Sequence, residues 1–248
     1  MAVAVIPYDG KDPLKYLLRT IHSIHEMGID VAVVDTSFFL YPPYVKRIKQ
    51  QSPGIGGARY DGFTWALQQG YDCIINADSH LMFHGDLHDL CKTKTWSSTY
   101  HHPWIEKPIP LTIPVKIYAS YVMYQDGKIF WCSVIGHKPQ LPLPMTSEPL
   151  YTIKRDVLEE IIEWWKISTS YGLDNVALLM APPGEIIPTT YYYHLISVVD
   201  RRKPLKRKPT DKDAELFITR IWPSAEQKVI SFHQALPQGS KICFQMWP

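Results

Sequence analysis

Short apolar runs alternate with amphipathic stretches over the first hundred residues of the chain. Residues 2–7 and 31–34 are small or β-branched and apolar, which predicts two buried strands. Between them, residues 14–27 carry apolar side chains three and four positions apart, which predicts a helix with one buried face. A third apolar run, residues 73–77, leads directly to Asp78. Strands that alternate with helices predict an α/β fold with a mainly parallel sheet flanked by helices.

The stretch between the second and third strands predicts two further helices, residues 44–51 and 58–69. Glycines at residues 54–57 predict a break between them, and Gly70 is expected to close the second helix. Further along, the sequence Gln-Asp-Gly at residues 125–127 lies between two apolar runs, which predicts an antiparallel hairpin.

The second half of the chain predicts two more helices, residues 155–167 and 175–180. The segment 201–208 carries six Lys or Arg side chains and a proline, a composition typical of a solvated loop. Large apolar residues recur after it, so we expect the C-terminal part to pack on the core. We therefore predict a single domain at residues 1–200, followed by the basic loop and a C-terminal extension at residues 201–248.

Composition limits the classes of function. With 248 residues, 46% hydrophobic content and a net charge of +2, the chain can bury a full core but lacks the basic excess of a nucleic-acid-binding protein. Its four cysteines are far apart and form no CxxC pair, so we expect reduced thiols in a cytoplasmic protein. No apolar run reaches the length of a membrane span. The basic segment 201–208 could hold the protein peripherally against anionic lipid, or close over a bound diphosphate.

Asp78-Ser79-His80 directly follows the third predicted strand. A carboxylate and an imidazole two positions apart at a strand end can point to the same side and share one divalent ion. Such an ion can neutralise a leaving diphosphate.

This segment, residues 75–80, resembles the metal motif of GT-A glycosyltransferases, which is D-x-D in most members. Its D-S-H form is similar to that of the polypeptide N-acetylgalactosaminyltransferases. Further segments resemble, in order, the elements of the broader inverting, family-2-like core: residues 5–8, 33–37, 57–62, 147–156 and 171–175, with His194 in the place of a late metal-binding histidine. The chain departs from that pattern at Asp9, where asparagine is usual, and at Thr146-Ser147-Glu148, where a glycine pair is usual.

The resemblance implies a GT-A fold and a role for each matched residue. It places an ion, Mn²⁺ or Mg²⁺, on Asp78, His80 and His194. It assigns the remaining roles as follows: Tyr8 and Asp9 beside the nucleotide base, Asp35 at the base or ribose, Arg59 at the diphosphate or in support of the base pocket, and Asp78 in donor binding as well. Asp174 is the catalytic carboxylate facing the acceptor, where it takes the proton if the reaction inverts and positions the substrate if it retains.

The implied activity is transfer of a sugar from a UDP- or GDP-linked donor to a hydroxyl on a glycan, lipid or protein. Two alternatives stay open. One is a nucleotidyltransferase of similar fold, although residues 8–13 lack the glycine-rich basic loop usual there. The other is a noncatalytic protein that binds nucleotide or carbohydrate on the same fold.

Several of these residues also have simple structural interpretations. Asp35 could cap a turn, Arg59 could pair with a surface acid, Asp174 could cap a helix, and His194 could be a core histidine. His80, His84 and His88 could line one helix face as a zinc site, but Gly85 interrupts such a helix. For His101 and His102 we expect an acceptor-side loop or plain surface.

Overall fold

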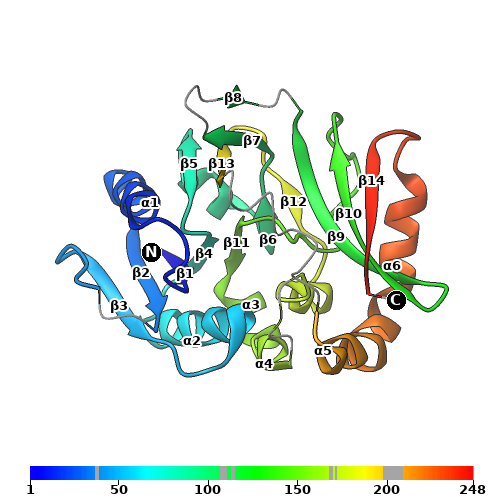
Figure 1. Ribbon diagram of the computed structural model, residues 1–248, viewed down its shortest axis with the longest axis horizontal. Helices are drawn as coiled ribbons and strands as arrows, with labels where there is room; N and C mark the ends of the chain where they lie inside the picture. Colours follow the sequence, from blue (N-terminus) through cyan, green and yellow to red (C-terminus); the bar gives the residue numbers. More distant parts are fainter. Residues whose placement is uncertain are drawn as a thin grey trace.

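The computed structural model describes residues 1–36, 39–106, 111–112, 115–167, 170, 172–197 and 209–247. Two mixed β-sheets lie side by side, with helices packed on them (Figure 1). The predicted α/β class, with a mixed and mainly parallel central sheet flanked by helices, is confirmed.

The first sheet contains the predicted parallel strands. Its order is β12 (Glu185–Ile186), β6 (Trp96–Ser98), β11 (Leu150–Lys154), β4 (Cys73–Ala77), β1 (Ala2–Tyr8), β2 (Asp30–Asp35) and β3 (Val45–Lys49). β1 pairs in parallel with β2 and β4, and β2 pairs in parallel with β3, whereas β11 runs antiparallel to β4 and β6.

Helices α1 (Leu14–Glu26) and α2 (Gly54–Gln68) cover opposite faces of this sheet. Alternate side chains of β1 point to the two faces. Ala4 and Ile6 therefore pack in the cluster that contains α1, while Val3 and Val5 pack in the cluster that contains α2.

Gly62 lets α2 approach the sheet closely. A Cβ atom at this position would lie 2.4 Å from Val5 Cγ1 and 2.7 Å from Val34 Cγ2. Any larger residue would push the helix away from the strands.

The second sheet brings the late part of the chain beside the early part. The predicted hairpin is confirmed: β9 and β10 pair on either side of Asp126 and Gly127, both of which have positive φ. β13 pairs with both β5 and β7. The order is β14 (Lys241–Trp247), β10 (Lys128–Ile135), β9 (Ile117–Gln125), β7 (His101–Glu106), β13 (Tyr191–Ser197) and β5 (Leu81–His84), with β8 (Leu111–Thr112) on β7.

Residues 209–247 pack against the rest of the chain. They form α5 (Asp211–Leu216), a π-helical turn (Phe217–Ile221), α6 (Trp222–Ala235) and β14. β14 joins the second sheet through β10, and α6 packs on β9. The expected domain boundary near residue 200 and the basic segment 201–208 lie outside the described residues.

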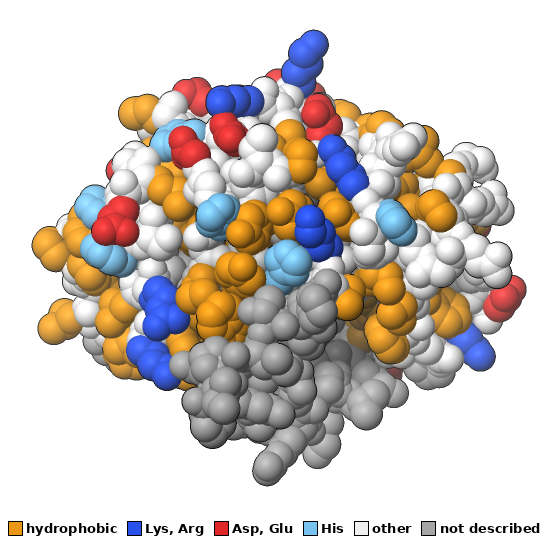
Figure 2. Space-filling model, turned by 90° about the horizontal axis from the view of Figure 1, so that it is seen from above, with side chains coloured by type: hydrophobic (Ala, Val, Ile, Leu, Met, Phe, Trp, Pro, Cys, Tyr) orange, Lys and Arg blue, Asp and Glu red, His pale blue; other side chains and the backbone are white. Residues whose placement is uncertain are grey.

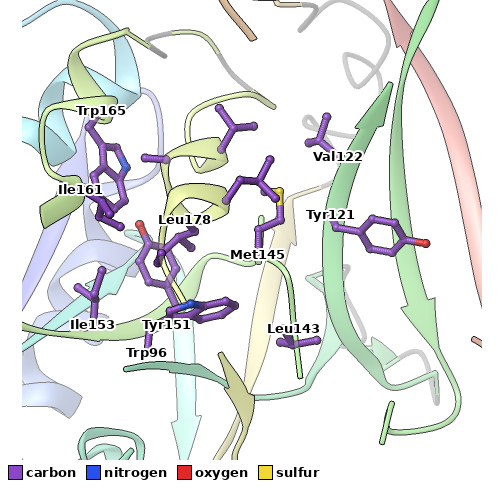
Figure 3. Close-up of a cluster of buried hydrophobic side chains, with 14 of the residues drawn as sticks. Trp96, Tyr121, Val122, Leu143, Met145, Tyr151, Ile153, Ile161, Trp165 and Leu178 are labelled. Carbon is purple, nitrogen blue, oxygen red and sulfur yellow. The ribbon is translucent and has the colours of Figure 1, made fainter. Parts of the chain in front are cut away.

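The main core joins the two sheets. Figure 3 shows Trp96, Tyr151 and Ile153 of the first sheet near Trp165 and Leu178. Val122 of the second sheet faces this group, and the Tyr121 ring points to the other side of its strand, where it packs on Phe232. The short helices α3 (Arg155–Ile161), α4 (Trp164–Ile167) and the 3₁₀ helix η2 (Val176–Met180) contribute to this core. The predicted helix 155–167 is therefore split in two, and the one at 175–180 is a 3₁₀ turn.

The helix predicted at residues 44–51 is wrong, because Val45–Lys49 forms the edge strand β3. Its charged side chains, Lys46, Arg47 and Lys49, are exposed, as an edge strand allows, and pairing with β2 overrides the local helical pattern. The predicted glycine break is also wrong, since α2 begins at Gly54. A Cβ at Gly57 would lie 2.6 Å from the carbonyl carbon of Ser52, so this glycine permits close contact with the preceding chain.

The expectation of reduced thiols is wrong as well. Cys73 pairs with Cys91, which lies on the 3₁₀ helix η1 (Leu87–Lys92). Cys132 on β10 pairs with Cys243, directly opposite it on β14. The second disulfide ties the C-terminal strand to the central hairpin. Among the described helices, none is long and apolar enough to cross a membrane.

Candidate functional site

The first polar cluster lies at the point where the strand order of the parallel sheet reverses. From β1 the chain passes through α1 to β2 on one side, whereas β4 lies on the other side of β1. Ligands of open α/β sheets bind outside the carboxyl ends of the strands at such a switch point. Asp12 follows β1 there and Asp78-Ser79-His80 follows β4, so the chain brings its polar side chains to this point.

These residues contact one another directly. The carboxylate oxygen Oδ2 of Asp12 accepts a hydrogen bond from Ser79 Oγ at 2.6 Å and lies 3.0 Å from His80 Nδ1. The Nε2 atom of His80 lies 2.7 Å from Nε2 of His194. His194 reaches this place because β13 pairs antiparallel with β5, which places His194 opposite Leu81.

Asp78, His80 and His194 each offer one ligand atom, and these atoms lie within 4.8 Å of one another. Desolvation lowers the pKa of His194 well below its ordinary value, with His80 and His101 acting in the same direction, so its imidazole is neutral and able to bind a metal. Burial raises the pKa of Asp78 even though Arg59 and His80 oppose it. A cation beside this carboxyl would favour its charged form. The donor set therefore fits a divalent ion.

Arg59 forms the second part of the site. Its side chain is 2% exposed and forms an ion pair with Asp174, which lies 115 positions away in the chain. Arg59 Nε donates to Asn76 Oδ1 at 2.8 Å, and a second nitrogen lies 3.5 Å from Asp78 Oδ1. Burial alone would lower the pKa of Arg59, but the charges of Asp174, Tyr151 and Asp78 and the hydrogen bond to Asp174 together outweigh burial and raise the pKa. One buried cation thus links the candidate metal ligand with the predicted catalytic carboxylate.

Asp174 also accepts a hydrogen bond from the backbone N–H of Gly172 at 2.8 Å. Its Oδ2 faces Arg59, and its side chain is 10% exposed. It therefore closes a local turn and contacts the Arg59 cluster at the same time.

A second buried ion pair lies beside this cluster. Glu148 Oε2 lies 2.7 Å from His101 Nδ1, and both side chains are almost completely buried. Burial would raise the pKa of Glu148, but the charge and hydrogen bond of His101, with hydrogen bonds from Ser120 and Tyr192, lower it below the ordinary value. The expectation that His101 lies in a loop or on the surface is wrong, since it is on β7 and packs against the ring of His194.

A cavity of about 230 Å³ connects these groups. Its lining includes Arg59, Asp78, Asp174 and His194, together with residues of β7, β9 and β10. Figure 2 views the molecule from the side on which β5, β7 and β13 lie, and histidine side chains are found there among hydrophobic ones. The remaining lining residues are Ile55, His101, Pro103, Ile117, Ser120, Trp131, Ser133, Ser147, Glu148, Pro149 and Asn175.

The other predicted site residues lie near the ends of β1 and β2. The Tyr8 hydroxyl donates to the backbone oxygen of Asp12 at 2.9 Å. Asp35 is fully buried, where Arg47 Nε lies 2.9 Å from its Oδ1 and the Tyr41 hydroxyl bonds its Oδ2. Asp9 is exposed and pairs with Lys11 at 2.6 Å.

Sequence reasoning gave no metal or catalytic role to three residues of this site. Asp12 lies in the predicted loop after the first strand, where its acidic side chain is a local signal, but nothing nearby relates it to His80. His101 and Glu148 meet only through the pairing of distant strands, so neither has a local signal. The zinc helix that Gly85 disfavoured is indeed absent from the described residues: His80 is in a turn, His84 on β5 and His88 in η1.

No protein-family profile matches the chain. It is 29% identical over 245 residues to an uncharacterized 26.8 kDa protein of Thermoproteus tenax virus 1 (strain KRA1), covering 94% of this chain and 98% of the viral protein. The similarity thus extends over nearly the whole length of both proteins.

Solved structures with low similarity were also found. A197 from STIV has a TM-score of 0.46 and 15% identity, covering 79% of this chain and 85% of that one. A protein described as a glucose-1-phosphate thymidylyltransferase from Bacillus anthracis, in complex with sucrose, has a TM-score of 0.43 and 13% identity, covering 86% and 99%. Mannose-1-phosphate geranyltransferase from Thermus thermophilus has a TM-score of 0.35 and 9% identity, covering 78% and 73%. All three TM-scores are below 0.5, so these similarities assign no function to the chain.

Proposed function

We propose that the protein is a metal-dependent glycosyltransferase of the GT-A type, which moves a sugar from a nucleoside diphosphate sugar to a hydroxyl acceptor. The observation that carries this proposal is the cluster of Asp78, His80 and His194 at the switch point of the parallel sheet. These groups lie where open α/β sheets bind phosphorylated ligands.

The donor set favours Mn²⁺ over Mg²⁺. Two imidazoles and one carboxylate suit a transition metal, whereas Mg²⁺ prefers oxygen ligands and keeps several waters. Asp12 would hold His80 through Nδ1, which leaves Nε2 for the metal. When bound, the ion supplies a Lewis acid that neutralises the negative charge of the leaving diphosphate.

The rest of the donor site is assigned from position. Arg59 lies 3.5 Å from Asp78 and would contribute positive charge near the diphosphate. Tyr8, Asp9 and Asp35 follow or end β1 and β2 at the same edge of the sheet, and we assign them to the nucleoside.

In the proposed reaction, the bond between the anomeric carbon and the β-phosphate oxygen breaks, and the acceptor oxygen forms a new bond to that carbon. The acceptor proton leaves for a carboxylate or water, and the nucleoside diphosphate departs with the electron pair. Asp174 lines the cavity next to the cluster. We assign it the proton in an inverting reaction, and the positioning of the acceptor in a retaining one.

The first test is calorimetric titration with UDP and GDP, with and without Mn²⁺ or Mg²⁺. We expect Mn²⁺ to strengthen binding of one nucleotide at least tenfold, and Asp78→Asn or His194→Ala to remove this gain. His88→Ala is the matched control, because His88 pairs with the exposed Asp86 outside the cluster. Nucleotide binding that no metal changes would overturn the proposal in favour of a noncatalytic protein.

A second test identifies the reaction. Incubation with a panel of nucleotide sugars and Mn²⁺ is expected to release the nucleoside diphosphate from one of them, through slow transfer to water. In parallel, nucleoside triphosphates are supplied with sugar 1-phosphates. Release of pyrophosphate in that arm alone would identify a nucleotidyltransferase instead.

A further inference from the structure

The cavity beside the candidate metal cluster is also lined by residues of β9 and β10. Ser120 on β9 and Ser133 on β10 lie opposite each other in the sheet, and Trp131 lies two positions from Ser133 on the same face. The volume of about 230 Å³ equals that of roughly eight liquid waters. This space accommodates one small ring rather than an extended chain.

The polar part of this lining presents hydroxyls and one carboxylate. Ser120 Oγ donates to Glu148 Oε1 at 2.6 Å and lies 2.9 Å from Ser133 Oγ. Glu148 is ionised and 2% exposed. A buried carboxylate accepts hydrogen bonds from neutral hydroxyls and disfavours an anion beside it, although His101 on its other oxygen offsets part of its charge.

Ser147 provides an independent indication of a ligand. Its Oγ atom is buried and has no hydrogen-bond partner among the described residues, and the residue lines the same cavity. Buried polar atoms almost always have a partner, from protein, water or ligand. A ligand hydroxyl in the cavity would supply it.

The apolar part of the lining completes the pattern. Trp131, Ile117 and Pro103 line the cavity beside the serines. Trp131 is half-buried, and its indole ring borders Gly172, where an added Cβ would lie 3.6 Å from it. A ligand that fits both parts has an apolar ring surface and a polar edge of neutral hydroxyls.

We propose that this cavity binds the acceptor, and that the acceptor is a neutral sugar residue of a glycan. That the bound sugar serves as the acceptor rests on the proposed function, but the binding of the sugar ring does not depend on it. Ser120, Ser133, Ser147 and Glu148 bond the hydroxyls, and Trp131 covers the ring. The reacting hydroxyl then lies on the side of Asp78 and Asp174.

The test is saturation-transfer NMR with methyl glycosides of glucose, galactose, mannose and N-acetylglucosamine, without nucleotide or metal. We expect at least one to bind, and glucuronate and glucose 6-phosphate to bind at least tenfold more weakly. Trp131→Ala and Ser133→Ala should each weaken binding at least fivefold. Trp104→Ala is the control, because Trp104 packs on Tyr193 outside the cavity.

If Trp131→Ala fails to fold, Trp131→Phe and Ser133→Ala keep the test valid. The absence of a saturation-transfer signal for every glycoside, or equal binding by the wild type and the cavity variants, would overturn the inference. Equal binding of neutral and anionic sugars would contradict the role of Glu148. Glycoside binding that persists without any metal-dependent nucleotide binding would overturn the proposed function and leave the sugar site standing.

Discussion

The carboxylate of Asp12 lies 3.0 Å from Nδ1 of His80, a residue 68 positions away. This contact leaves Nε2 of His80 directed at Nε2 of His194. A carboxylate behind a metal-binding histidine fixes the tautomer and orientation of the ring. In the proposed metal site, Asp12 would therefore orient His80 for an ion.

Replacing Asp12 with alanine should weaken Mn²⁺ binding roughly 10- to 100-fold, because His80 loses the partner that orients it. Titration of Mn²⁺ followed by electron paramagnetic resonance measures the affinity directly. Asp9→Ala is the matched control, because Asp9 is on the same loop but pairs with exposed Lys11. Equal losses in the two variants would mean that Asp12 acts only through the charge of the loop.

Much of the fold follows from local pattern. The strands at residues 2–7, 31–34 and 73–77 could be predicted because fully buried parallel strands are continuous apolar runs. The hairpin at residues 125–127 could be predicted because its turn requires positive φ, which glycine and aspartate adopt readily. These signals are independent of distant parts of the chain.

What depends on distant pairing could not be predicted. Residues 44–51 have helical spacing, yet the open edge of β2 binds them as a strand. The contact of His101 with Glu148 forms only when β7 lies next to the loop before β11. The disulfides likewise form only when β4 lies next to η1 and β10 next to β14. Sequence order indicated Asp78 and His80, but only the structure adds Asp12.

Removing the carboxylate of Asp174 should strongly destabilise the protein, because it leaves Arg59 buried without its main counter-charge. We expect Asp174→Ala to lower the free energy of unfolding by about 3–5 kcal/mol, toward the lower end since Asn76 and Asp78 still contact Arg59. Urea unfolding measures this loss. Asp156→Ala, at an exposed position in the first turn of α3, should cost well under half as much. Equal losses of unfolding free energy in the two variants would show that the buried Arg59–Asp174 pair stabilises the protein no more than an exposed carboxylate does.

Glu148 should make stability depend on acid pH. Its pKa is lowered in the folded protein, so its contribution is complete above the unfolded-chain value of about 4.3 and is lost as the pH falls through the folded-state pKa. Glu148→Gln should therefore be less stable at pH 6 and show a flatter decline below pH 4. Acid titration followed by circular dichroism compares the two curves. Exposed Glu226 provides the control substitution, Glu226→Gln, which should retain the wild-type decline.

The two disulfides should contribute unequally to stability. Each disulfide lowers the conformational entropy of the unfolded chain, and the effect grows with the length of the loop that it closes. The loops span 111 residues for Cys132–Cys243 and 18 for Cys73–Cys91. The chain-entropy relation gives about 5 and about 3 kcal/mol at 25 °C. Scanning calorimetry of the two double-serine variants should show the larger fall in Tm for Cys132→Ser with Cys243→Ser, roughly 10–20 °C for a chain of this size.

Reductant separates this effect from side-chain packing. It should lower the Tm of the wild type and leave each double variant sensitive only through its remaining disulfide. A variant lacking all four cysteines should not respond at all. If four thiols react in the folded, air-oxidised wild type and its Tm is indifferent to reductant, the pairs do not form, and the C-terminal strand is held on β10 by sheet hydrogen bonds and packing alone.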